Sequence, residues 1–218
     1  MHTVKRHLYL ASQSPRRRAL LESIGLTPIV LAPDASTDAE ALEAPLSGEA
    51  PLDYVARVAR LKRDHALERL RKTSSSMLKP RAHDLILSAD TTVALGGEIL
   101  GKPASPQEAK NTLSRLSANA HQVHTCVSII RFDRNEERTA TVSSQVTFAP
   151  LTAEWIDSYV ASGEPMDKAG AYGIQGLAGS MIPHIAGSYT GIMGLPLYET
   201  LQLIDAFDNG KSAAHRTD

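Results

Sequence analysis

The sequence has few features of a secreted or membrane-bound protein. It contains a single cysteine, Cys126, so no disulfide can form within the chain. No apolar stretch approaches the roughly 20 residues that a membrane-spanning helix needs. The apolar run near the amino terminus is too short for a signal peptide. We therefore expect a cytoplasmic protein with no membrane partner, and we expect Cys126 in the core because no catalytic His and Asn accompany it.

Net charge is also nearly absent. The 23 Lys and Arg residues almost cancel the 24 Asp and Glu residues, which leaves a formal charge of -1. No global field therefore draws the chain to a nucleic-acid polymer, and any site for a polyanion must be local. A composition of 42% hydrophobic and 22% charged residues is typical of a globular protein and excludes whole-chain disorder. A length of 218 residues fits one large domain or two small ones that share a cleft.

The order of the predicted elements indicates an α/β fold. The apolar run at 7–11 predicts a strand, and Ser14 and Pro15 then predict the cap and first residue of a helix that ends at Gly25. Residues 33–44 and 170–194 are predicted loops, 73–84 an insertion or linker, and 209–218 a frayed tail. Further strands are predicted at 27–32, 85–95, 98–100, 121–132 and 139–148, and further helices at 52–70, at 106–116 behind a capping box at Ser105, near 155–160, and from 196 to before 209.

The first turn of the first helix carries an unusual run of cations. Arg16, Arg17 and Arg18 lie where the positive end of the helix dipole disfavours them. With the hydroxyls of Ser12 and Ser14 and the free amides of the helix start, they would form a phosphate cradle. A serine-rich turn after a strand is a place where α/β folds bind ligands. The alternative is that these arginines are solvated at the surface.

Two charged residues interrupt apolar patterns. Lys62 shares a helix side with Val58 and Ala59, where an ammonium would need an anion, although spacing alone favours a lysine that extends its head group to water. Asp90 lies in an apolar strand, where an ionised carboxylate is costly unless it is paired or bound to metal. It is therefore either a metal ligand or base, or a structural carboxylate in a salt bridge or turn cap.

Residues 96–103 match G-x-x-x-x-G-K without being a P-loop. Pro103 stands where Ser or Thr would bind Mg²⁺, and it favours an extended Lys102 instead of a helix start. This excludes the P-loop and disfavours a nucleotide-dependent kinase. Lys102 is either a phosphate contact or a surface hairpin lysine. His121 and His124 are three apart in a predicted strand and face opposite sides, so they make a poor metal pair.

A family resemblance rests on several segments taken in order: LASQSPRR at 10–17, SADTTV at 88–93, LGKP at 100–103, HQVHT at 121–125 and GLPLYE at 194–199. Together they resemble the Maf family of nucleoside triphosphate pyrophosphatases. The segment at 166–176, MDKAGAYGIQG, is similar to the branch that acts on dTTP and UTP, and not to the branch that acts on 7-methyl-GTP. The resemblance implies a single domain over residues 1–218, with an elongated mixed sheet flanked by helices and two lobes around a central cleft. It implies cleavage of the bond between the α- and β-phosphates, which yields a monophosphate and pyrophosphate.

The resemblance also implies roles for individual residues. Asp90 would be the general base or a metal-binding carboxylate, and Arg16, Thr91 and Gln175 would help to select the base. The amide of Gln175 offers a donor and an acceptor that match the edge of uracil or thymine, so UTP, dTTP and modified pyrimidine nucleotides are the expected substrates. A divalent ion, Mg²⁺ or Mn²⁺, would offset the phosphate charge. The residues that would hold the triphosphate are Ser12, Arg16, Arg17, Lys62 and Lys102; a homodimer is left open.

One segment departs from the family pattern. Similar proteins place an acidic pair after the second strand, including a Glu that assists the metal, but Thr37 falls near that position here. Asp38 is then favoured over Asp34 as the metal-binding oxygen donor, and the alternative is that both are solvated. A rival function is a nucleotide-binding regulator of cell division with little turnover. The presence of Asp90 and both lysines argues against that rival.

Overall fold

A single mixed sheet organises the chain. The computed structural model describes residues 6–31, 43–72, 80–133 and 136–209. The order of the strands is β2-β1-β3-β5-β6-β7, and β4 pairs with β3 outside this path. The pairs of β1 with β2 and β3 are parallel and the other pairs are antiparallel, so the expected α/β class with a mixed sheet is confirmed. The strands are β1 Leu8–Leu10, β2 Ile29–Val30, β3 Leu85–Leu95, β4 Glu98–Leu100, β5 Ala120–Arg131, β6 Glu137–Thr147 and β7 His184–Ala186.

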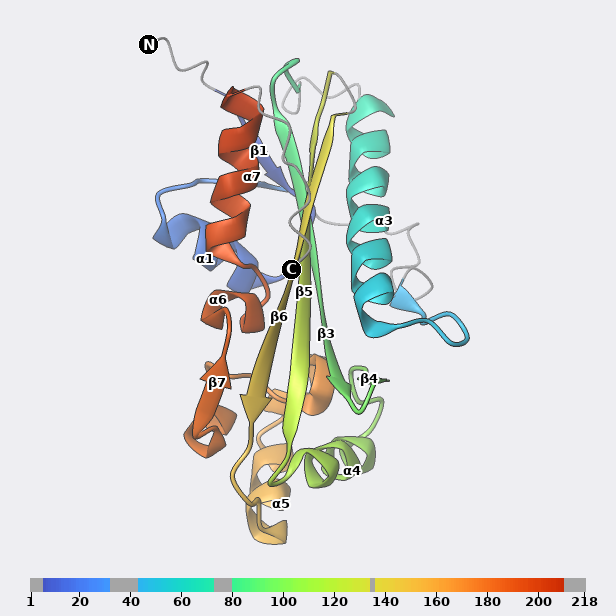
Figure 1. Cartoon of the computed structure of the whole chain (residues 1–218), viewed down its shortest axis with the longest axis vertical. Coiled ribbons are helices and arrows are strands. Elements are labelled where there is room, and N and C mark those ends of the chain that lie inside the picture. Colours follow the sequence, from blue (N-terminus) through green and yellow to red (C-terminus); the bar gives the residue numbers. More distant parts are fainter. Residues whose placement is uncertain (1–5, 32–42, 73–79, 134–135, 210–218) are drawn as a thin grey trace.

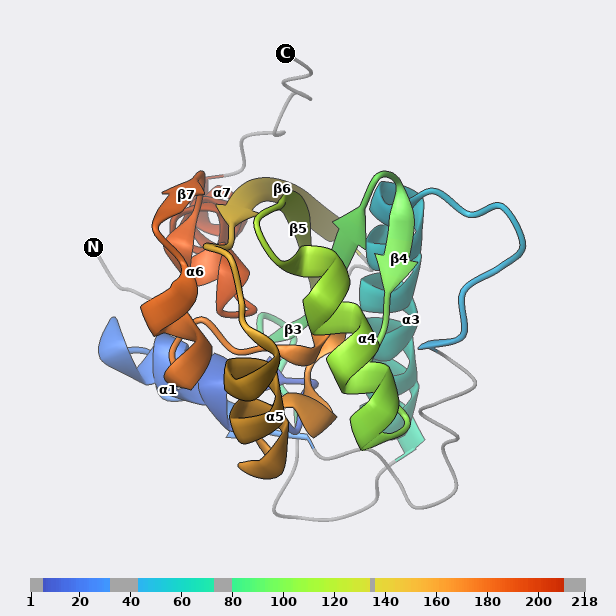
Figure 2. The same cartoon turned by 90° about the horizontal axis from the view of Figure 1, so that it is seen from below.

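Helices cover both faces of the sheet. In Figure 1, α3 lies on one side of the long strands β3, β5 and β6, whereas α1 and α7 lie on the other; α4 and α5 pack at the lower end. The view from below separates the same two sides (Figure 2). The α-helices are α1 Pro15–Ser23, α3 Pro51–Lys72, α4 Pro106–Leu116, α5 Ala153–Ala161, α6 Tyr189–Ile192 and α7 Leu197–Asn209, and the 3₁₀ helices are η1 Glu164–Asp167, η2 Ala169–Ala171 and η3 Leu177–Met181. No helix within these described ranges is long and apolar enough to cross a membrane.

The alternation of side chains along β3 decides which residues face which layer. Ile86 packs with Leu67 and Leu70 of α3, whereas Leu85 and Leu87 pack on the layer of α1 and α7. Because successive strand residues point to opposite faces, Asp90 shares the face of Ile86 and Thr91 shares the opposite face. Cys126, directly opposite Asp90 on β5, is buried under α3 as expected.

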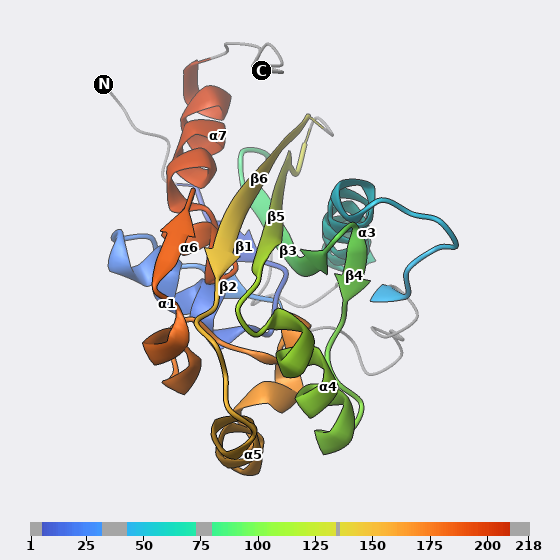
Figure 3. The same cartoon turned by 60° about the horizontal axis from the view of Figure 1, so that its bottom comes forward.

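A further apolar cluster fills the lower end of the molecule, where α4 and α5 close over the ends of β5 and β6 (Figure 3). His121 belongs to this end. Its ring stacks on Phe148 with the ring centroids 5.7 Å apart, and its Nε2 lies 2.7 Å from the hydroxyl oxygen of Tyr172. His121 is therefore a core residue.

The local signals in the sequence predicted the helix starts well. The Ser14 hydroxyl accepts a hydrogen bond from the Arg17 amide at 3.5 Å, and the Ser105 hydroxyl accepts one from the Glu108 amide at 3.2 Å. Both serines therefore cap their helices as expected. At the turn between β3 and β4, Gly96 and Gly97 have φ angles of 59° and 86°, which favour glycine.

Other boundaries differ from the prediction. The predicted loop at 170–194 instead contains η3, β7 and α6. The sequence did not reveal them, because elements of three to five residues are too short to show a period. The helix α7 reaches Asn209, one residue into the predicted tail. Residues 73–79 of the predicted linker and 210–218 of the predicted tail lie outside the described residues. Within 80–84, the buried Asp84 accepts hydrogen bonds from the amides of Arg81 and His7, which ties this end of the segment to β1.

Candidate active site

The candidate site lies where the pairing of one edge of β3 is interrupted. β1 pairs with this edge at Leu85–Leu87, and β4 pairs with it at Val93–Leu95. Between them, the described part of the chain provides no partner strand on this edge for residues 88–92. Asp90 is at the centre of this interval, so the fold itself opens the sheet beside the carboxylate that the sequence singled out.

A chain of alternating charges crosses the interval. The ammonium of Lys62 donates to Asp90 Oδ1 at 2.6 Å and lies 2.7 Å from Glu43 Oε1. The other carboxylate oxygen of Glu43 lies 2.9 Å from the ammonium of Lys102. The prediction from spacing, that Lys62 extends to water, is therefore wrong. The lysine turns inward because two carboxylates meet its ammonium.

The two carboxylates have opposite pKa shifts. Asp90 is only 6% exposed, and this burial raises its pKa above the usual range even though Lys62 and Arg17 lower it. Burial would also raise the pKa of Glu43, but Lys62 and Lys102 together bring it below the usual range. Neighbouring groups whose environments separate their pKa values are typical of acid–base sites. Here Glu43 is the carboxylate that stays ionised, and Asp90 is the one better suited to accept a proton.

Arg17 is partly buried and packs against protein oxygens. Its guanidinium donates to the carbonyl of Gly194 at 2.8 Å, to the Ser12 hydroxyl at 3.2 Å and to the Thr91 hydroxyl at 3.4 Å. Burial lowers the pKa of Arg17, and the nearby Asp90 opposes this shift. The alternative of a solvated arginine is therefore wrong for Arg17, which joins the turn before α1 to β3 and to the turn before α7.

The three arginines of the first turn have different surroundings. Arg16 is partly exposed, and its guanidinium lies 3.9 Å from the carboxylate of Asp167 in η1. Arg18 faces solvent and pairs with Glu22 one turn along α1 at 2.7 Å. The phosphate cradle proposed from the sequence therefore reduces to Arg16 and Arg17 with the two serines, and Arg18 lies outside it.

Thr91 and Gln175 belong to different elements and have different contacts. The Thr91 hydroxyl lies 2.9 Å from that of Thr125, which donates to the carbonyl of Gly191 at 2.8 Å. Gln175 lies on the exposed loop between η2 and η3, and no hydrogen bond connects it to another described residue. Its amide is therefore available to a ligand.

Two described carboxylates could hold a metal. The described residues contain no group of three or more His, Cys, Asp or Glu side chains with metal-binding geometry. However, Asp90 and Glu43 both approach the Lys62 ammonium, and a pair of carboxylates completed by substrate phosphates fits the way in which Mg²⁺ binds. Glu43 was missed by the sequence analysis, because nothing in the spacing of the acidic segment distinguishes it from the other acidic residues there. Asp34, Thr37 and Asp38 lie outside the described residues, so the metal role of Asp38 stays a prediction.

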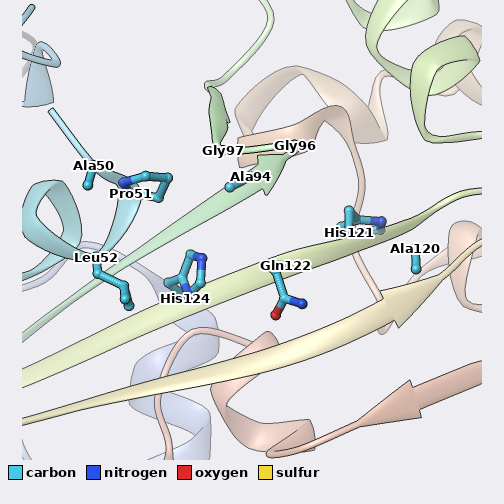
Figure 4. A pocket seen from close by; sticks show the side chains of 10 residues that line it. All are labelled: Ala50, Pro51, Leu52, Ala94, Gly96, Gly97, Ala120, His121, Gln122 and His124. Carbon is cyan, nitrogen blue, oxygen red and sulfur yellow. The ribbon is translucent and has the colours of Figure 1, made fainter. Parts of the chain in front are cut away.

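The structure also contains a pocket that is separate from these charges. It has a volume of 390 Å³ and is lined by the start of α3 at Ala50, Pro51 and Leu52, the turn at Gly96 and Gly97, and the start of β5. Figure 4 shows His124 and Gln122 on β5 opposite this helix start. None of the candidate residues lines this pocket, so the site is defined by its charged groups and not by this cavity.

Comparison with known proteins identifies the family. The chain matches the model of the Maf-like protein family over residues 7–207, and it belongs to this family. It is 54% identical to the dTTP/UTP pyrophosphatase of Polaromonas sp. strain JS666 over 91% of this chain and 95% of that protein. It is 52% identical to the dTTP/UTP pyrophosphatase of Ralstonia nicotianae over 91% of this chain and 92% of that protein. The protein of the same name from Dechloromonas aromatica is 48% identical over 90% of this chain and 95% of its own length.

Proposed function

We propose that this protein hydrolyses dTTP and UTP to the nucleoside monophosphate and pyrophosphate. The relatives that cover almost the whole chain have this activity in their names. The observation that carries the proposal is the Lys62 ammonium held between Asp90 and Glu43, with Lys102 beside them, next to the turn of Ser12 and Ser14. This arrangement combines a buried base with cations that can bind phosphate.

The triphosphate would bind across the interrupted edge of β3. Lys102 is 56% exposed and can turn its ammonium to a phosphate without breaking a buried contact. Arg16 is also partly exposed, and its only ion pair among the described residues spans 3.9 Å. Arg17 is already hydrogen-bonded to protein, so its part is to hold Ser12 and Thr91 in place and to add positive charge.

Asp90 would act as the general base. A raised pKa makes its carboxylate a stronger proton acceptor, and the hydrogen bond from Lys62 fixes its orientation. As a water oxygen bonds to phosphorus, Asp90 accepts the water proton. The bond between the α- and β-phosphates breaks, and its electron pair leaves with pyrophosphate, whose charge the lysines and Arg16 stabilise.

A divalent cation would be held by Asp90 and Glu43. Their oxygens are hard donors of the kind that Mg²⁺ prefers, and substrate phosphates would supply further oxygen donors. When bound, it would neutralise charge on the phosphates that two carboxylates would otherwise repel. Asp38 stays a candidate for a further oxygen donor.

Gln175 would select the base. Held in one orientation, its amide can pair with the alternating acceptor and donor edge of uracil or thymine, and a base that covers this amide without pairing with it would cost about 1 to 3 kcal/mol. Thr91 and Arg16 would complete the selection.

A nucleotide panel tests the proposal. The protein is incubated with UTP, dTTP, CTP, ATP, GTP or 7-methyl-GTP in Mg²⁺ or Mn²⁺, and released pyrophosphate and orthophosphate are measured separately. We expect pyrophosphate as the inorganic product and the highest kcat/KM for UTP and dTTP. Orthophosphate release, or a preference for 7-methyl-GTP, would overturn the reaction or the substrate class. Tight UTP binding without turnover would favour the regulatory alternative.

A further inference from the structure

The loop that carries Gln175 is held at both ends by one carboxylate and one hydroxyl. Glu164, at the start of η1, accepts a hydrogen bond from the Leu177 amide through Oε2 at 3.1 Å. Its Oε1 accepts one from the Tyr159 hydroxyl at 2.9 Å. The same hydroxyl accepts the Gly173 amide at 3.2 Å. Gln175 therefore lies midway in the sequence between Gly173 and Leu177, whose amides are hydrogen-bonded to the Tyr159 and Glu164 side chains.

Two glycines of the loop lie close to the side chains of Glu164 and Lys168. A Cβ atom added to Gly176 would overlap the carboxylate of Glu164. A Cβ added to Gly173 would lie 2.9 Å from Lys168 Cε, so the end of the Lys168 side chain would have to shift. The loop thus rests directly on Glu164 and Lys168 on either side of Gln175.

The support under the loop is connected to the candidate site. Lys168 donates to the Glu164 carbonyl at 2.6 Å and to the Asp167 carboxylate at 2.6 Å. Asp167 in turn faces Arg16 at 3.9 Å. In η2, the Gly170 amide donates to the Gly101 carbonyl at 3.1 Å, beside Lys102. The segment 164–170 therefore links the position of the Gln175 loop to Arg16 and to the turn that carries Lys102.

We propose that Glu164 and Tyr159 are positioning residues for base selection, which hold the 173–177 loop so that the amide of Gln175 meets the edge of a pyrimidine. This inference rests on the proposed function. Burial and the hydrogen bond with Glu164 raise the pKa of Tyr159, so its hydroxyl stays protonated and remains the donor to the carboxylate. Neither side chain needs to touch the nucleotide, because both act through the backbone of the loop.

The test compares Glu164→Gln and Tyr159→Phe with the parent by the ratio of kcat/KM for UTP to that for CTP. Glu164→Gln keeps the shape of the side chain, but its NH₂ group then faces either the Tyr159 hydroxyl or the Leu177 amide, which both donate to Glu164 in the parent. Tyr159→Phe keeps the packed ring and removes only the hydroxyl. We expect the ratio to fall at least about fivefold in each variant, as for the misalignment of one buried hydrogen bond. Glu154→Gln in α5, an exposed carboxylate with no contact to the loop, is the matched control and should keep the parent ratio.

Two combined variants separate positioning from a general structural role. The double variant Glu164→Gln/Tyr159→Phe should lose at least as much selectivity as either single variant, because the two changes release opposite ends of the same loop. In a Gln175→Ala background, Glu164→Gln should leave the ratio unchanged, because the group that it positions is gone. Urea unfolding of every variant confirms that it is folded.

An equal fall in kcat/KM for UTP and CTP would overturn the inference, as would an unchanged ratio in a folded Glu164→Gln or Tyr159→Phe variant. Both outcomes leave the proposed function standing if the parent still prefers UTP. A parent that shows no preference between UTP and CTP would overturn the proposed base selection and this inference with it.

Discussion

Replacing Lys62 with methionine should move the acidic limb of the pH–rate profile to higher pH. The ammonium lies 2.6 Å from Asp90, and its charge lowers the pKa of this carboxyl, which burial alone would raise further. An opposite charge at such a distance shifts a carboxyl pKa by roughly 1 to 3 units. Lys62→Met keeps the length of the side chain and removes the charge. We therefore expect the pH midpoint of the acidic limb of kcat/KM for UTP to move up by about that amount.

The same change has a predicted effect on stability. A carboxyl whose pKa is higher in the folded state than in the unfolded chain contributes stability below its unfolded pKa, and this contribution is lost as pH rises through its folded pKa. In Lys62→Met this loss should continue to higher pH than in the parent. At about 1.4 kcal/mol per unit, a shift of roughly 1 to 3 units corresponds to about 1.4 to 4 kcal/mol once Asp90 is ionised. This agrees in order of magnitude with the roughly 3 to 5 kcal/mol lost when one partner of a buried ion pair is removed.

The assay is the dependence of kcat/KM on pH, with urea unfolding across the same pH range. Titration of the UTP phosphates is common to all the variants, so the difference from the parent is the relevant quantity. Lys102→Met is the matched control, because Lys102 contacts Glu43 and, within the described part of the chain, makes no ion pair with Asp90. It should raise KM and leave the limb near that of the parent. If Lys62→Met and the parent have the same acidic limb, Lys62 does not set the protonation of the catalytic base, and the reasoning is refuted.

Two further predictions concern other charged or titrating groups. Glu43→Gln should move the acidic limb to lower pH, opposite to Lys62→Met, because the Glu43 charge raises the pKa of Asp90, and it should increase the Mg²⁺ concentration that gives half-maximal rate; an upward shift of the limb would contradict this. Burial lowers the pKa of His121 to about 4, so the parent should lose stability as pH falls from 6.5 towards 4, by roughly 3 kcal/mol. In His121→Gln this dependence should shrink by about that amount in urea unfolding, and an unchanged dependence would show that another group causes it.

The sequence predicted the elements whose signals are local. Ser14 with Pro15, Ser105 with Pro106, and the paired glycines at 96 and 97 each determine a cap or turn from a few neighbouring residues, and the structure has these features where they were expected. Asp90 was singled out for the same reason, since its charge contrasts with the adjacent apolar residues of its strand.

What the sequence could not predict depends on contacts between distant segments. The inward turn of Lys62 requires Asp90, 28 residues further on, and Glu43 before it. The inward position of Arg17 requires the carbonyl of Gly194, which is 177 residues away. Local periodicity does not encode contacts between such distant residues. Spacing therefore favoured a Lys62 side chain that extends to water, and it left open whether the arginines bind a ligand or are solvated. The carboxylate of Glu43 was missed for the same reason.

The most direct test of the central claim is pyrophosphate release from UTP by Asp90→Asn and by the parent at the same Mg²⁺ concentration. The amide keeps the shape of the carboxylate but cannot accept the water proton, so we expect comparable urea unfolding and a loss of roughly 10² to 10⁴ in kcat. If the folded Asp90→Asn variant releases pyrophosphate as fast as the parent, Asp90 is a structural partner of Lys62 and the proposed mechanism is wrong.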